Sequence, residues 1–72
     1  MNRKNINRIR VVLAEQNRTN KWLAEQLKVS EITVSRWVNN TQQPAVEIFV
    51  DIAEILKVDI RDLFESTLKK NN

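Results

Sequence analysis

Residues 19–39 read TNKWLAEQLKVSEITVSRWVN, and this stretch decides the fold. Its apolar residues recur at steps of three and four, which is the spacing of one buried helix face. Thr19 and Ser30 are favourable N-caps, so we expect a helix after each of them. Only Lys28 and Val29 separate the two patterns, and so short a turn requires the helices to cross at a steep angle. The residues expected to face inward are Leu23, Ala24 and Leu27 in the first helix, and Val34, Trp37 and Val38 in the second.

Helical spacing continues on both sides of this pair. Upstream, an apolar run starts at Ile6 and ends near Asn17, a residue type that tolerates the left-handed conformation closing many helices. Downstream, Pro44 stops any earlier helix, and a fourth helix is expected over about 45–57. Asp59 is a favourable cap for a short fifth helix. The inward residues expected in these three helices are Ile6, Ile9, Val12 and Leu13; Val46, Phe49, Ile52, Ala53 and Leu56; and Ile60, Leu63 and Phe64.

The prediction is an all-α fold, a compact bundle of five short helices with a central helix-turn-helix. The chain has 72 residues, no glycine and one proline, which leaves no composition shift that would mark a linker. We therefore expect a single domain, 1–72, with a core over about 6–66 and a frayed tail at 67–72.

Composition excludes several classes of function. The chain lacks cysteine and histidine, so disulfides, thiolate metal sites and the commonest general base are absent, and no metal or cofactor is predicted. The nine carboxylates are spread over helix faces beside Lys and Arg, without a glycine-rich loop, so neither an enzyme nor a small-molecule ligand is expected. The longest apolar run is VVLA at 11–14, so we expect neither a membrane span nor a secretory leader, and a cytoplasmic protein.

The charge is unevenly distributed along the chain. The net charge is +3, but residues 1–36 hold eight Lys and Arg against three Asp and Glu, whereas residues 37–72 hold four against six. A basic half beside an acidic half is typical of a protein with one face for a polyanion, although small proteins also have uneven charge by chance.

The order of residues in 19–39 (a cap, a polar pair, Leu-Ala, Leu, a turn, Val-Ser, Val, then Ser-Arg-Trp) resembles the helix-turn-helix of the phage repressor/Cro (XRE-like) type. Asn7-Arg8-Ile9-Arg10 resembles that family's opening helix. Pro44, the run IAEILKV at 52–58 and Asp62-Leu63-Phe64 resemble its closing helices, and residues 7–64 follow the pattern without a gap. The resemblance implies a lambda repressor-like fold and a transcriptional regulator that binds double-stranded DNA.

In such a protein the helix over about 31–39 enters the major groove, where side chains near its N-terminus reach base edges. Arg36 suits the two acceptors of guanine, and its alternative is a solvated arginine. Glu31 suits cytosine, or it only stabilises the helix N-terminus or orients Arg36. Ile32 suits contact with a thymine methyl or with a partner protein, or it is exposed by chance and has no partner. The predicted base contacts are Glu31, Ile32, Ser35 and Arg36.

Contacts to phosphates are expected to supply most of the affinity. Asn20 stands where the family often has a glutamine that holds a phosphate at the start of a helix. The turn at 41–43 is polar and uncharged where the family is commonly basic, so contacts there would be neutral hydrogen bonds. For each residue the alternative is exposure without contact. The predicted phosphate contacts are Thr19, Asn20, Lys21, Thr33, Asn39, Arg8 and Arg10.

Three departures from the family pattern are informative. Lys28 and Asn40 replace the usual glycines; asparagine tolerates a positive φ, whereas holding Lys28 left-handed costs roughly 1–2 kcal/mol. Leu13 and Val38 replace a common Arg–Glu pair, and an apolar contact can substitute for such a pair at little cost. Ala45 replaces the usual cap of the fourth helix.

The C-terminal half carries apolar residues left over once the predicted core is filled: Ile48, Val50 and Ile55. We expect them to form the interface of a homodimer whose two half-sites on DNA lie about 34 Å apart. Trp22 is apolar where the family is polar; it either covers the first two helices or forms a small exposed patch.

A different class of function stays open. The same fold could serve as a protein-interaction or antitoxin-like module with weak or no DNA binding, which acidic Glu31 and the neutral 41–43 turn favour. Salt-dependent binding to duplex DNA discriminates between the two hypotheses.

Overall fold

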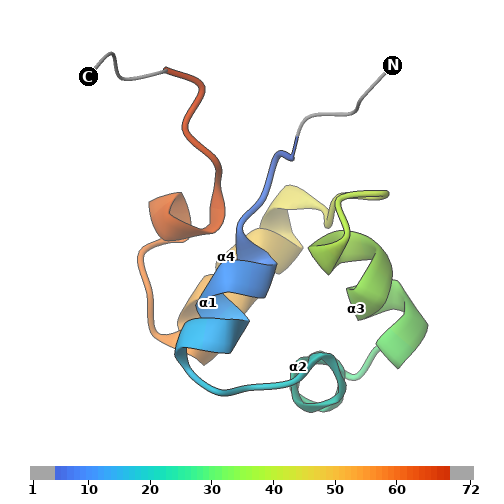
Figure 1. Ribbon diagram of the computed structural model, residues 1–72. Helices are drawn as coiled ribbons and strands as arrows, with labels where there is room; N and C mark the ends of the chain where they lie inside the picture. Colours follow the sequence, from blue (N-terminus) through green and yellow to red (C-terminus); the bar gives the residue numbers. More distant parts are fainter. Residues whose placement is uncertain (1–4, 69–72) are drawn as a thin grey trace.

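Local sequence signals set the helix boundaries in the computed structural model, which describes residues 5–68. The helices are α1 (Ile9–Glu15), α2 (Asn20–Leu27), α3 (Glu31–Val38) and α4 (Val46–Leu56), followed by a 3-10 turn, η1 (Ile60–Leu63). Figure 1 shows α2 end-on and α3 from the side, so their axes cross steeply, as the short turn predicted. The part of the expected tail at 69–72 lies outside the described residues.

The predicted capping residues act as expected. The Thr19 hydroxyl accepts a hydrogen bond from the Trp22 N–H at 3.0 Å, and the Ser30 hydroxyl accepts one from the Thr33 N–H at 3.1 Å. Ala45 provides no side-chain cap for α4, also as expected. Among residues 5–68, four adopt a positive φ: the expected Asn17, Lys28 and Asn40, and also Lys57 after α4.

The prediction of five helices was wrong, because the described chain has four α-helices and η1 is a single 3-10 turn. Asp59 caps this turn as expected, but Phe64 is already extended, with φ −117° and ψ 146°. The reason is a pairing between distant segments. Phe64 forms an antiparallel bridge with Asn7, and the Arg8 N–H donates to the Leu63 carbonyl at 2.8 Å. Pairing requires extended backbone, so the helix cannot continue.

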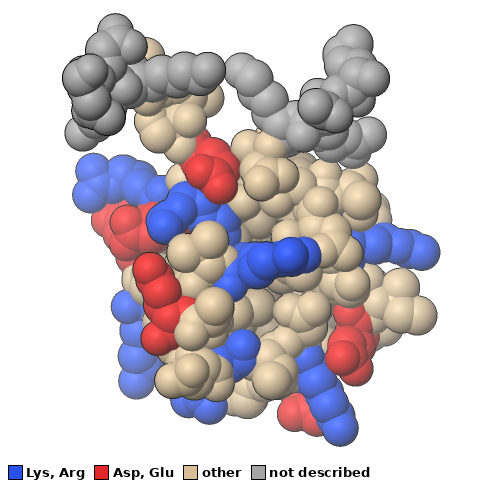
Figure 2. All heavy atoms as spheres, in the orientation of Figure 1, with Lys and Arg blue, Asp and Glu red and all other residues tan. Residues whose placement is uncertain are grey.

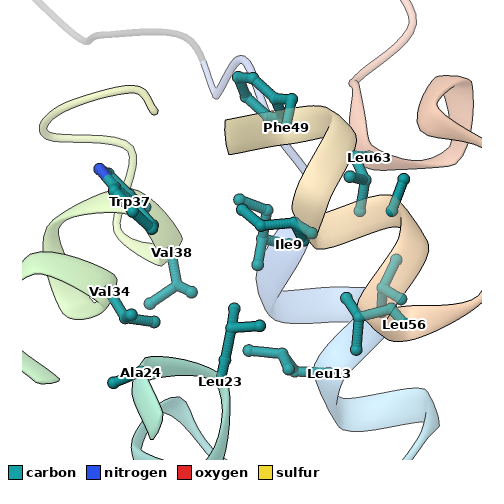
Figure 3. Close-up of a cluster of buried hydrophobic side chains, with 13 residues drawn as sticks. Ile9, Leu13, Leu23, Ala24, Val34, Trp37, Val38, Phe49, Leu56 and Leu63 are labelled. Carbon is teal, nitrogen blue, oxygen red and sulfur yellow. The ribbon is translucent and has the colours of Figure 1, made fainter. Parts of the chain in front are cut away.

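One core joins all five elements (Figure 3). Leu13 and Val38, which replace the charged pair of the family, are both buried in it. Three residues expected to face inward are instead exposed: Ile6, in the extended segment before α1; Val46, the first residue of α4; and Phe64, which stacks on Phe49 at 4.5 Å between ring centroids. The buried apolar residues are Ile9, Val12, Leu13, Leu23, Ala24, Val34, Trp37, Val38, Phe49, Ile52, Ala53, Leu56 and Leu63.

Candidate nucleic-acid interface

Helix α3 has one buried and one exposed face. Val34, Trp37 and Val38 are buried in the core, which fixes the rotation of the helix about its axis. The opposite face carries the residues predicted to contact bases: Glu31, Ile32 and Arg36 are exposed, and Ser35 is half-buried. Ile32 is 66% exposed, so this apolar side chain has no place in the core. The outer face of α3 is therefore free to meet another molecule.

Arg36 extends from this face without a carboxylate partner. The ion pair formed among residues 5–68 joins Asp59 and Arg61, so neither Glu31 nor another acid lies within ion-pair distance of Arg36. The backbone carbonyl of Arg36 is occupied, because the Thr41 N–H donates to it at 3.0 Å and the Thr41 hydroxyl donates to it at 3.1 Å. These hydrogen bonds attach the segment after α3 to the end of the helix. They leave the Arg36 guanidinium available for contact with another molecule.

Two of the predicted phosphate contacts also serve the protein's own structure. The Thr33 and Ser30 hydroxyls are hydrogen-bonded to each other at 2.8 Å at the start of α3. The Thr19 hydroxyl is occupied by the cap of α2. Lys21 is exposed and Asn20 half-buried at the same helix start. Asn20 and Lys21 therefore remain the more available groups there.

Trp22 has a partner that the sequence pattern does not predict, Arg18. The Arg18 guanidinium carbon lies 4.3 Å from the centroid of the Trp22 ring, which is a cation–π distance. Trp22 is half-buried and packs against the core, so it is neither a fully exposed patch nor a fully buried cover. The pair holds one arginine close to the start of α2.

A chain of side-chain hydrogen bonds links α1 to α3. Arg10 on α1 donates from Nη2 to Asn39 Oδ1, and Asn39 Nδ2 donates to Ser35 Oγ at 3.4 Å. Arg8, just before α1, donates from Nη1 to the Asp62 carbonyl at 3.1 Å. The structure thus brings together Arg10, Asn39 and Ser35, three predicted contact residues that lie on different helices or at their ends.

A buried amide cluster fixes the segment that follows α3. Asn7 and Asn40 are 2% and 5% exposed, and Asn7 Nδ2 donates to the Trp37 carbonyl at 2.9 Å and to Gln43 Oε1 at 2.8 Å. Gln43 Nε2 in turn donates to Asn40 Oδ1 at 3.1 Å. Gln43 is therefore committed to the fold, which leaves less of the 41–43 turn for phosphate contacts. Asn40 was recognised only for its positive φ, and no sequence signal identified Asn7.

The two signs of charge are mixed on the face that Figure 2 shows. The uneven division along the sequence therefore does not separate the charges on this face. Among residues 5–68 there is no group of three or more His, Cys, Asp or Glu that could hold a metal ion. Within the same range, no helix is both long and apolar enough to cross a membrane. The described surface includes charged and apolar side chains on the outer face of α3.

Comparison with known proteins gives two matches of the same kind. A family model described as helix-turn-helix matches residues 8–63. A crystal structure described as that of "a putative DNA-binding protein from Bacteroides fragilis" is 55% identical in sequence, with a TM-score of 0.82. That match covers 83% of this chain and 97% of the other. No curated protein matches the chain.

Proposed function

The chain belongs to the helix-turn-helix family of the XRE type, and from this membership we propose that it is a sequence-specific regulator that binds double-stranded DNA. The single observation that carries the proposal is that α3 has one buried face and one exposed face. Its buried stripe anchors it in the core, while Glu31, Ile32 and Arg36 are exposed on the opposite face. A major groove is about 12 Å wide and admits a helix carried in this way.

In the proposed complex, the outer face of α3 lies along the base edges. Arg36 has the planar fork of donors that suits the O6 and N7 atoms of guanine. Ile32 supplies the apolar contact that a thymine methyl requires, and Glu31 and Ser35 complete the reading face. Asn20 and Lys21 at the start of α2 contact phosphates on the flank of the groove, where their role is to orient α3.

We further propose that the protein binds as a symmetric dimer through its C-terminal half. Val50 is 43% exposed on α4 and is the best placed of the three apolar residues expected at the interface. Ile48 and Ile55 are half-buried and packed against the core, so they are not left over from it as expected, and only part of each can contribute. A two-fold arrangement would present two α3 helices to half-sites about 34 Å apart.

The test is selection of bound duplexes from a random-sequence pool, followed by measurement of affinity against salt. We expect an enriched sequence with half-site symmetry, and affinity that falls steeply between about 50 and 200 mM salt. Arg36→Ala should cost about 1–3 kcal/mol on the selected site and relax the preference at one base pair. Lys57→Gln, which changes the net charge equally but lies after α4, is the matched control. A pool that stays random after selection would contradict the proposal.

Exposed Ile32 beside Glu31 favours a second candidate, a protein-interaction module of the same fold. An apolar side chain and an acid on the outer face suit a protein partner better than a polyanion. The same selection discriminates the two, because this candidate predicts no enriched sequence and no steep dependence on salt. Under it, Ile32→Ala would weaken binding to the partner protein more than Arg36→Ala would.

A further inference from the structure

A hollow of about 210 Å³ opens beside α3, between the segment before α1 and the end of α3. Its lining includes Arg8, Arg10 and Asn39, three of the residues that the sequence separately predicted to contact phosphate. Asn39 lies 29 positions from Arg10 along the chain, yet their side chains are hydrogen-bonded across the hollow's edge. The fold therefore gathers these donors in one place instead of spreading them over the surface.

The charges around the hollow favour an anion. Two arginines, Arg8 and Arg10, line it against one acidic residue, Glu65. Neither guanidinium has an acid within ion-pair distance, since the ion pair in the described part of the chain is Asp59–Arg61. Each is hydrogen-bonded to a neutral oxygen instead, Arg8 to the Asp62 carbonyl and Arg10 to the Asn39 amide. A guanidinium has five N–H donors, so both retain donors for a ligand.

The buried side chains that line the hollow have their hydrogen bonds satisfied within the protein. Asn7 and Asn40 line the hollow. The Asn40 side-chain amide is hydrogen-bonded to the Asn7 backbone and to Gln43, and the Asn7 side-chain amide is hydrogen-bonded to Gln43 and to the Trp37 carbonyl. No buried side-chain nitrogen or oxygen lacks a partner in the part of the chain that the structure describes. The lining residues that recognise a ligand in the hollow are therefore Arg8, Arg10 and Asn39.

The size of the hollow limits what it can hold. Sites for drug-sized ligands measure about 300–1,000 Å³, whereas a water molecule occupies about 30 Å³ in the liquid. A hollow of about 210 Å³ lies between these values. It therefore has room for a small oxyanion but not for a drug-sized ligand.

We propose that this hollow is an oxyanion site that seats one phosphate group. In the free protein the ligand is inorganic phosphate; on DNA it is one backbone phosphate at the C-terminal end of α3. The DNA form rests on the proposed function, whereas the free-anion form does not. Because Arg10 is linked through Asn39 to Ser35, a phosphate seated there also fixes a residue of the outer face of α3.

The free protein is tested by titration with inorganic phosphate, followed by ¹H–¹⁵N NMR. We expect saturable shifts at the Arg10 side-chain Nε–H and the Asn39 side-chain amide, and no such shifts with sodium chloride at equal ionic strength. Arg10→Gln should abolish the saturable shift at Asn39, whereas Arg10→Lys, which keeps the charge, should retain part of it. The thermal melt of each variant confirms that it is folded.

The DNA form is tested with opposite changes of charge in the same hollow. Arg10→Gln should lower the slope of log K against log salt by about 1 and weaken binding to all duplex sequences roughly fivefold to tenfold. Glu65→Gln removes the negative charge of the one acidic residue that lines the hollow and should strengthen binding. Lys57→Gln and Glu54→Gln make the same changes of charge away from the hollow and should leave the slope within a few tenths of wild type.

The outcomes separate this proposal from the function proposed above. DNA binding with the expected opposite effects of Arg10→Gln and Glu65→Gln supports both. DNA binding that neither variant alters, together with no saturable phosphate shift, overturns the oxyanion site and leaves the regulator intact. A saturable phosphate shift in a protein that binds no duplex supports the site and overturns the regulator. If the protein shows neither a saturable phosphate shift nor binding to duplex DNA, both the oxyanion site and the regulator are overturned.

Discussion

Asn7 and Asn40 lie 33 positions apart and are joined by two hydrogen bonds. Asn40 Oδ1 accepts from the Asn7 backbone N–H at 2.9 Å, and Asn40 Nδ2 donates to the Asn7 carbonyl at 3.2 Å. The same Oδ1 accepts from the Ile6 N–H at 2.8 Å. One side chain thus satisfies the backbone of the segment before α1, and does so from a residue whose φ is positive. Asn40 therefore has two separate structural roles.

Asn40→Gly separates these roles. Glycine accommodates the positive φ better than asparagine, but it removes the acceptor of two backbone N–H groups in a buried region. We expect the loss to dominate and to lower the free energy of unfolding by roughly 2–3 kcal/mol, measured by urea denaturation. A variant as stable as wild type would contradict the expectation that the lost hydrogen bonds outweigh the gain at the positive φ.

Lys28→Gly provides the matched case, because Lys28 has the same positive φ, 60°, without a comparable side-chain network. Relief of the left-handed strain outweighs the added freedom of glycine in the unfolded chain, so we expect a gain of roughly 1 kcal/mol. For a domain of this size the melting temperature should rise by roughly 4–8 °C. Lys57→Gly, at φ 58°, should behave alike. An unchanged melting temperature in both variants would argue against strain at these turns.

Features that depend on neighbouring residues could be predicted from the sequence. Thr19 and Ser30 cap their helices through N–H groups three residues ahead, and the left-handed Lys28 follows from the place of the turn. The burial of Val34 and Trp37 follows from their spacing.

Features that depend on partners far away in the sequence could not be predicted from it. Asn7 looks like any polar residue before a helix, because its partners Trp37 and Gln43 lie 30 and 36 positions away. The prediction of a fifth helix was wrong for the same reason, because Phe64 forms an antiparallel bridge with the distant residue Asn7. The hollow beside α3 likewise exists only once α1 and α3 are packed together.

The exposed pair of Asp59 and Arg61 predicts a small dependence on pH. Hydrogen bonds from Arg61 lower the pKa of the Asp59 carboxyl below its usual 3.8. A depressed pKa in the folded state means that the pair stabilises the fold above pH 3.8, and that this contribution is lost as pH falls through the lowered pKa. An NMR titration of Asp59 should therefore give a pKa below 3.8, and Arg61→Gln should raise it. An Asp59 pKa at or above 3.8 in the wild-type protein would contradict the pairing.

The stacking of Arg18 on Trp22 predicts a local and measurable effect. Arg18→Gln removes the cation while leaving the backbone N–H of residue 18 bonded to the Leu13 carbonyl. We expect the free energy of unfolding to fall by about 0.5–1 kcal/mol, the value of an exposed cation–π contact. The indole N–H signal of Trp22 should shift in the NMR spectrum, and that of buried Trp37 should not. Equal shifts of both signals would indicate a change in the whole fold instead.

The proposed dimer is best tested at Val50, because it is exposed and its substitution leaves the core intact. Val50→Lys places a charge in the proposed apolar interface, so we expect the dimer Kd to rise at least roughly tenfold, which corresponds to about 1.4 kcal/mol. Sedimentation equilibrium over a range of concentrations measures it. Val11→Lys, at a valine of similar exposure on α1, is the control and should leave the Kd unchanged. Ile55→Ala is less informative, since Ile55 also packs against the core and its loss lowers stability. A wild-type protein that sediments as a monomer at every concentration would contradict the dimer in the absence of DNA.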